Sequence, residues 1–367
     1  MARIAVDARP LASPTTGIGR YTKALLERLF NSQHDWFLYT HKKLLVDFSR
    51  FSNVTIRSAD VDLSGSSSLI SQFFFPVWSR KDKIDLFWSP RHHLPLLMPD
   101  HIAQVVTIHD LVWLNYPNTM SVGGRYLEKL CMPGSLKKAR KIISVSKSTA
   151  LDISNFFPEF DEKIVTIYEA PFIDLIEGCP TLGDYFLFVG TIEPRKNLIT
   201  LLEAYKLYSS DVEYPLPLKI CGGKGWGMPE LNKKIDELGL SGRVEILGYI
   251  DDENMAELYK DARALLMPSL YEGFGLPIVE ALSQGTPVLT SNRGATAEVA
   301  GDAGVLVTPE DAREICGGLE LLTLDLKNVK ILQQLALKRS QSFSWDVAAN
   351  SSLQLFETLL ENCAVSY

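Results

Sequence analysis

The chain has 367 residues, of which 46% are hydrophobic and 22% charged, a composition typical of globular proteins and long enough for two domains. No apolar run reaches the length of a membrane-spanning helix, and residues 1–7 are typical of a first strand rather than of a signal peptide. The five cysteines are widely separated and show neither disulfide nor metal-site spacing, which indicates a reduced, cytoplasmic protein.

The net charge of −7 is distributed unevenly between the two halves of the chain. Residues 1–170 hold 21 Lys and Arg against 16 Asp and Glu, whereas residues 171–367 hold 16 against 28. The asymmetry indicates either an anionic partner of the first half or a chance distribution of solubilising charge. Nucleic acid binding is not favoured, because the chain has no basic arm and none of the usual motif spacings.

Short apolar runs alternate with amphipathic stretches along the whole chain, which predicts two α/β units with parallel sheets covered on both faces. The candidate strands are Ile4–Asp7, Trp36–Tyr39, Leu86–Trp88, Gln104–Ile108, Ile142–Val145, Val165–Tyr168, Tyr185–Val189, Leu218–Cys221, Val244–Leu247, Ala264–Met267, Pro287–Thr290 and Val305–Val307. The predicted domains are residues 1–170 and 184–343, joined by a Pro- and Gly-containing linker over 171–183 and followed by a helix in 344–367. Two doubly wound domains would place a ligand cleft between them.

The run Tyr271–Glu280 is the most informative segment of the chain. A buried strand ends at Pro268, glycines follow at 273 and 275, and Pro277 suits the first turn of a helix that Gly285 would end. A helix start of this kind favours phosphate, and Glu272 and Glu280 place one carboxylate on each side of it. The alternative is an ordinary strand-to-helix connection with two solvated glutamates.

Further candidates follow other predicted strands. Arg195 and Lys196 stand before a helix for which Asn197 is the expected N-cap, and two cations at a helix start suit a diphosphate. His109 ends a strand, and Asp110 either orients its ring or acts as an N-cap beside a loop histidine. Gly17 and Gly19 begin the first helix without dinucleotide or Walker spacing, and Tyr249 offers backbone to a base. Each of these residues also has a purely structural explanation, and no DxD pair predicts a metal site.

Taken together and in this order, these residues resemble the retaining glycosyltransferases of family 4, which have the GT-B fold of two Rossmann-like domains. Glu272 and Glu280 match the Glu-x7-Glu element of that family, and the stretch 195–197 matches its basic pair. Gly17 matches its first glycine loop and His109 a sugar-contacting histidine. The resemblance covers nearly the whole chain, although Glu169-Ala170-Pro171 stands where the family often has Asn-Gly, which leaves hinge behaviour open.

The resemblance implies a metal-independent enzyme without cofactor that uses a nucleotide-sugar donor. It assigns Glu280 to the ribose hydroxyls and Glu272, with the backbone of Gly273, Phe274, Gly275 and Leu276, to the donor sugar. Arg195 and Lys196 would neutralise the leaving diphosphate, and the terminal helix would cross back to the first domain.

Segments 7–11 and 16–21 further resemble bacterial mannosyltransferases of lipopolysaccharide and O-antigen assembly. This favours GDP-mannose over UDP-hexoses as the donor, and a glycan or lipid-linked acceptor. It also predicts a cytoplasmic enzyme. The basic segment 136–141 offers peripheral contact of the N-terminal domain with the inner membrane, and the favoured alternative is a solvated helix end. The competing hypotheses are a sugar-nucleotide epimerase and a non-enzymatic sugar-nucleotide-binding protein.

Overall fold

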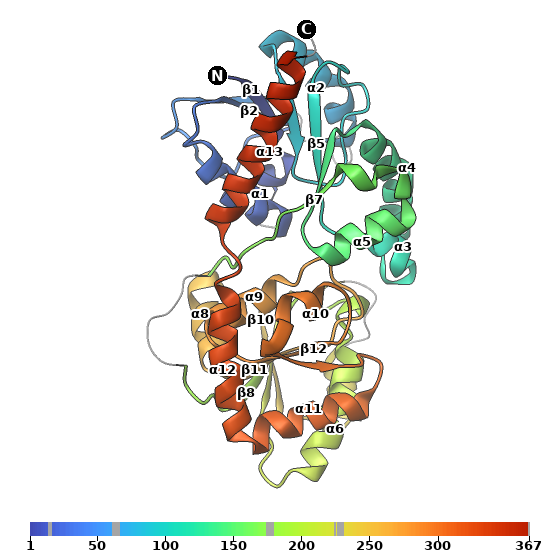
Figure 1. Cartoon of the computed structure of the whole chain (residues 1–367). Helices are drawn as coiled ribbons and strands as arrows, with labels where there is room; N and C mark the ends of the chain where they lie inside the picture. The colour runs from blue at the N-terminus through green and yellow to red at the C-terminus, as the bar shows by residue number, and fades with distance from the viewer. Residues whose placement is uncertain (14–16, 61–66, 174–179, 224, 226–230, 366–367) are drawn as a thin grey trace. The chain divides into compact units, whose positions relative to one another are not determined.

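The computed structural model describes residues 1–13, 17–60, 67–173, 180–223, 225 and 231–365. Parts of three predicted segments lie outside the described residues: residues 14–16 ahead of Gly17, residues 174–179 of the linker and residues 366–367 of the terminal helix. The chain forms two compact units (Figure 1). Unit 1 contains residues 1–113, 122–169 and 345–367, and unit 2 contains residues 114–121 and 170–344.

Unit 1 is built on a seven-stranded parallel sheet with the order β3-β2-β1-β4-β5-β6-β7. Its strands are β1 (Arg3–Asp7), β2 (Asp35–Thr40), β3 (Val54–Ser58), β4 (Leu86–Ser89), β5 (Ala103–Ile108), β6 (Lys141–Ser144) and β7 (Ile164–Thr166). Residues of β1, β4 and β5 are almost all buried, which agrees with their continuous apolar sequences.

The helices of unit 1 are α1 (Gly17–Leu29), α2 (Ser67–Asp82), α4 (Val122–Lys138), α5 (Lys147–Phe156) and α13 (Trp345–Val365), while the short α3 (Val112–Asn115) contains residues of both units. The C-terminal helix α13 packs along α1 (Figure 1). Arg28 on α1 donates to Asp346 over 2.5 Å, and the ring of Phe356 lies 5.6 Å from that of Trp88. The last helix of the chain is therefore part of the unit that contains the first strand.

Unit 2 contains a six-stranded parallel sheet with the order β10-β9-β8-β11-β12-β13. Its strands are β8 (Tyr185–Val189), β9 (Leu218–Cys221), β10 (Val244–Gly248), β11 (Ala262–Met267), β12 (Val288–Ser291) and β13 (Gly304–Val307). Its helices are α6 (Leu198–Asp211), α7 (Leu231–Glu237), α8 (Asp252–Lys260), α9 (Leu276–Ser283), α10 (Gly294–Ala300), α11 (Ala312–Leu324) and α12 (Leu326–Ser340). Helices α6 and α11 pack together, and α9 packs against α10 and α12.

The prediction of two parallel α/β units is confirmed, and each sheet has the Rossmann strand order. All twelve predicted strands are present within a few residues of their expected ends. One strand, β3, was not predicted. It is an edge strand of five residues whose side chains are only half-buried or exposed, so its sequence lacks the apolar run by which the others were found.

Candidate functional site

The order in which the chain adds strands to the unit 2 sheet reverses between β8 and β11. These two strands pair side by side although β9 and β10 lie between them in the chain. In an open parallel sheet such a switch point leaves a crevice at the carboxyl ends of the two strands, because the connections leave in opposite directions. The segment after β8 carries Arg195 and Lys196, and the segment after β11 carries Glu272. The topology therefore brings the two predicted groups to one place.

Hydrogen bonds join these two segments directly. The backbone N–H of Leu270 donates to the carbonyl of Arg195 over 2.9 Å, and Nη1 of Arg195 donates to the carbonyl of Tyr271 over 3.0 Å. Asn197 is the N-cap residue of α6, as predicted, with a φ of 58°. Its side chain does not bond to the helix backbone, and its Nδ2 donates to the carbonyls of Pro268 and Pro309. The amide holds three loops together in place of the helix end.

Glu272 lies between the two predicted cations. Arg195 Nη1 donates to Glu272 Oε2 over 2.5 Å, and Lys196 Nζ donates to Glu272 Oε1 over 2.7 Å. A further carboxylate, Glu193, accepts from Arg195 Nη2 over 2.6 Å. Burial by itself raises the pKa of Glu272, but the charges of Arg195 and Lys196 outweigh it and lower that pKa to about 2. Glu272 is therefore ionised at neutral pH.

Lys196 is buried rather than solvated, with 8% of its surface exposed. Burial lowers the pKa of Lys196, and the Glu272 carboxylate opposes that shift. Within the described residues, the ammonium has one hydrogen-bond partner, Glu272, although it carries three donors. Two donors of a buried cation thus remain for an anionic ligand.

Helix α9 begins directly after this segment, with Gly275 as its N-cap and a proline in its first turn, as predicted. Gly275 has a φ of 108°, a conformation that residues other than glycine rarely adopt. Glu280 is buried on α9, and its Oε2 accepts a hydrogen bond of 2.9 Å from the hydroxyl of Tyr259 on α8. The Phe274 side chain packs edge-on against Phe343, with ring centroids 5.7 Å apart.

Glycines follow β8 and β9 at the point where the backbones of these two strand ends come close together. A Cβ at Gly222, after β9, would stand 1.9 Å from the carbonyl oxygen of Gly190, after β8, so only glycine fits there. A Cβ at Gly190 would lie 3.3 Å from the Lys196 side chain. Tyr249, after β10, is 80% exposed. Several strand ends therefore allow close backbone approach beside the buried cation.

In unit 1, His109 lies at the carboxyl end of β5, as predicted, but Asp110 does not orient it. The ring instead bonds through Nδ1 to Glu169 Oε1 over 3.0 Å and through Nε2 to the carbonyl of Pro90 over 2.9 Å. Asp110 accepts from the backbone N–H of Val112, at the start of α3. Asp110 therefore takes the capping role that was its alternative explanation, and the carboxylate that bonds to His109 comes from a segment 60 residues away in sequence.

The remaining candidates of unit 1 surround the first helix. Gly17 begins α1, and a Cβ there would meet nothing within 4 Å, whereas Gly19 is buried. Tyr21 packs edge-on against His109 with centroids 4.8 Å apart. The opening motif around Asp7 forms an internal ion pair, in which Arg9 Nη2 donates to Asp7 Oδ2 over 2.6 Å.

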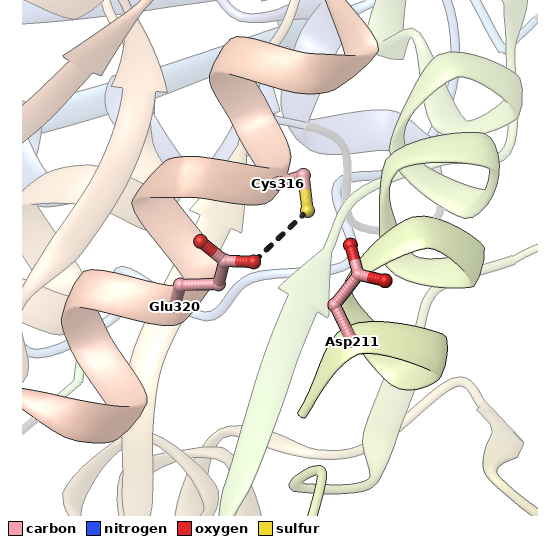
Figure 2. A group of neighbouring side chains, drawn as sticks. All are labelled: Asp211, Cys316 and Glu320. Carbon is pink, nitrogen blue, oxygen red and sulfur yellow. Dashed lines mark hydrogen bonds between the residues drawn. The ribbon is translucent and has the colours of Figure 1, made fainter. Parts of the chain in front are cut away.

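A different group in unit 2 has the composition of a metal site. Oxygen or sulfur atoms of Asp211, Cys316 and Glu320 lie within 4.8 Å of one another where α6 packs against α11 (Figure 2). The Cys316 thiol donates to Glu320 Oε1 over 3.7 Å, and burial together with the two carboxylates raises its pKa to about 11. Cys316 and Glu320 lie one turn apart on α11, so this hydrogen bond is internal to that helix, and Asp211 approaches the two side chains from α6.

Three partners in these contacts were not found by sequence reasoning: Glu193, Tyr259 and Glu169. Glu193 lies two residues before Arg195, and its place in the predicted strand-end segment was a signal that could have been used. The other two approach from distant parts of the chain. In the part of the chain that is described, no helix combines the length and apolar character needed to cross a bilayer.

Residues 177–338 match the family model described as "Glycosyl transferases group 1". The chain is similar to O-antigen chain mannosyltransferase B of Escherichia coli, with 29% identity over 97% of this chain and 100% of that protein. It is 30% identical to O-antigen chain mannosyltransferase RfbU of Salmonella typhimurium over 62% of each chain. It also resembles the serotype-specific mannosyltransferase WbdA of Escherichia coli, with 27% identity over 70% of this chain, and spans 34% of that protein.

Solved structures with the same fold cover almost the whole chain. Sucrose-phosphate synthase from Thermosynechococcus elongatus aligns with a TM-score of 0.78 at 19% identity, over 99% of this chain and 100% of that one. WaaG, a glycosyltransferase involved in lipopolysaccharide biosynthesis, aligns with a TM-score of 0.72 at 14% identity, over 96% and 99%. The chain thus has the GT-B fold of two Rossmann-like domains.

Proposed function

The chain belongs to the group 1 glycosyl transferases, and from this premise we propose that it is a retaining hexosyltransferase that moves mannose from GDP-mannose onto a glycan or lipid-linked acceptor. The relatives named as O-antigen mannosyltransferases support mannose as the sugar and bacterial surface polysaccharide as the product. A UDP-sugar is the alternative donor.

One observation carries the proposal: a cationic pair, the half-buried Arg195 and the buried Lys196, is fixed at the switch point of the unit 2 sheet. Transfer from a nucleotide sugar develops negative charge on the departing diphosphate. Cations that are already oriented stabilise that charge without reorganising during the reaction. Lys196 has donors to spare, and Glu272 holds both cations in position until the diphosphate arrives.

The carboxylates are assigned to the donor in this proposal. Glu280, at α9, binds the ribose hydroxyls, and the hydroxyl of Tyr259 fixes the orientation of its side chain. Glu272 and the backbone of residues 273–276 contact the sugar. The leaving phosphate then takes the proton of the acceptor on the face from which it departs, which gives retention. Gly17, Gly19 and Tyr249 contribute backbone to the donor. His109 contacts the sugar with its ring, which Glu169 and the Pro90 carbonyl hold in place.

A thermal-shift series with GDP-mannose, UDP-glucose and UDP-GlcNAc tests the donor. A ligand at about 100 times its Kd stabilises the native state by about 2.7 kcal/mol, so the melting temperature of unit 2 should rise by several degrees with GDP-mannose. Product analysis by NMR then reads the anomeric configuration. If none of the nucleotide sugars raises the melting temperature, the proposal is overturned. Conversion of the donor sugar into its epimer without an acceptor would identify an epimerase.

A lipid-linked acceptor would hold the enzyme at a membrane surface, and we include peripheral contact with the inner face of the membrane, through unit 1, in the proposal. The positive balance of residues 1–170 supports this contact.

A further inference from the structure

Helix α2 has an apolar surface toward solvent. Ile70 and Phe75 are buried in unit 1, as expected for the inner side of a surface helix. The opposite side carries Leu69, Phe73 and Val77, at intervals of four residues and 62%, 59% and 59% exposed. Residues four apart lie on one face of a helix, and this face is normally polar. The exposed row of α2 is therefore available to an apolar partner outside the core of unit 1.

The apolar row continues onto α4 through the segment 94–97. The N–H of Leu96 donates to Gln72 Oε1 on α2 over 2.7 Å, and Lys138 Nζ on α4 donates to the carbonyl of Leu96 over 2.6 Å. The Leu96 side chain rests against Gly134, where an added Cβ would approach it to 3.2 Å. Leu130, one turn before Gly134 on α4, is 79% exposed. Side chains from three segments thus form one surface, which we call the α2–α4 face: Leu69, Phe73, Val77, Leu96, Leu97 and Leu130.

A basic hollow adjoins the α2–α4 face at the end of α4. It has a volume of about 560 Å³, and its lining includes four cations: Lys137, Lys138, Arg140 and Lys163. The lining contains one acidic residue, Asp100, which pairs with Lys138 but has a 98% exposed carboxylate. Gln104 also lines the hollow, and its buried Oε1 has no hydrogen-bond partner within the described residues. The hollow is therefore suited to an anionic group that also carries hydroxyls.

We propose that the α2–α4 face and the basic hollow dock unit 1 onto an anionic phospholipid membrane. The exposed leucines and phenylalanine enter the headgroup–acyl boundary, and Lys137 and Arg140 contact the lipid phosphates. Binding to an anionic interface grows with buried apolar area and with the number of nearby cations, and this surface supplies both side by side. The inference deepens the proposed function, since it locates the membrane contact that a lipid-linked acceptor demands.

A second copy of the chain fits this surface less well. A twofold dimer would use the same patch on both copies, so it would bring two sets of four cations toward one interface. Like charges at such an interface repel, whereas an anionic bilayer neutralises them.

The test is flotation of the full chain with phosphatidylcholine vesicles, with and without phosphatidylglycerol. Wild type should float only with the anionic vesicles. Leu97→Ser/Leu130→Ser and Lys137→Gln/Arg140→Gln should each lower the partition coefficient about tenfold. The effect of the charge pair should fade as NaCl rises from about 0.05 to 0.5 M. Leu324→Ser and Lys233→Gln, exposed positions of unit 2, are the matched controls and should float as wild type.

Failure of wild type to float, or equal losses in the controls, would overturn the docking proposal. A concentration-dependent dimer in light scattering that Leu97→Ser/Leu130→Ser abolishes would overturn it in favour of self-association. The rise in melting temperature with GDP-mannose measures donor binding independently of membrane binding. This rise should be the same in all four variants as in wild type. Loss of that shift in wild type, with flotation retained, would count against the proposed donor and leave the membrane surface standing.

Discussion

Glu169 and His109 form a hydrogen-bonded pair, with Glu169 Oε1 3.0 Å from Nδ1 of the imidazole. The other ring nitrogen faces the carbonyl of Pro90 over 2.9 Å. Both nitrogens face acceptors, so the ring makes both bonds only when each nitrogen carries a proton. The edge of Tyr21 completes a rigid setting for the ring. Glu169 is therefore a positioning residue for His109, at the point where the sequence departs from the Asn-Gly of the family.

Removing this carboxylate should loosen His109 without changing donor binding. We expect Glu169→Ala to lower kcat about tenfold or more, because misplacement of a positioned group by about 1 Å costs up to 100-fold. The KM for the donor should stay within about twofold, since the cationic pair lies in unit 2. Glu169→Gln, which keeps an acceptor oxygen, should recover most of the rate. An unchanged kcat in Glu169→Ala would contradict the positioning role.

Glu272 should be necessary for both stability and transfer. Glu272→Ala removes the carboxylate that pairs with the buried Lys196, whereas Arg195 keeps Glu193, and breaking a buried ion pair in this way costs about 3–5 kcal/mol. We expect a lower urea midpoint with folded protein at low denaturant, together with loss of transfer. Glu310→Ala, which removes an exposed partner of Arg293, is the control and should cost less than about 1 kcal/mol. Near-normal turnover in Glu272→Ala would refute the assignment to the donor site.

The acid stability of the chain should depend on the same carboxylate. The folded-state pKa of Glu272, about 2, lies below its ordinary value of 4.5. Its contribution is therefore fully present above pH 4.5 and is lost as the pH falls toward 2. In that window the unfolding free energy of wild type should fall more steeply than that of Glu272→Gln, by up to about 1.4 kcal/mol per pH unit. The unfolding free energies come from urea titrations at each pH. If they fall with pH at the same rate in wild type and in Glu272→Gln, Arg195 and Lys196 do not lower the pKa of Glu272.

The sequence was sufficient for every described strand except β3, and for placing Glu272 on the same side of the unit 2 sheet as Arg195 and Lys196. Apolar runs locate the strands, and parallel topology brings the ends of neighbouring strands together. It was insufficient for partners that come from outside these strand ends, such as Tyr259 on α8. Asn197 shows a related limit, because it is the N-cap as predicted but its amide bonds to carbonyls of two distant loops. Likewise, His109 bonds to the distant Glu169 rather than to the adjacent Asp110. Local pattern predicts position, whereas the partner of a polar side chain depends on the packed structure.

Transfer should not require a divalent metal, since Arg195 and Lys196 are fixed cations at the predicted diphosphate position. We expect activity in EDTA to stay within about twofold of the untreated rate, whereas a metal-dependent transferase would lose nearly all of it. The group of Asp211, Cys316 and Glu320 supplies the control, because Asp211→Asn/Cys316→Ser removes two of its three candidate ligands. That variant should respond to EDTA as wild type does. If EDTA abolishes transfer and Mn²⁺ restores it, a purely cationic mechanism is contradicted. If this loss occurs in wild type but not in Asp211→Asn/Cys316→Ser, Asp211 and Cys316 are identified as metal ligands.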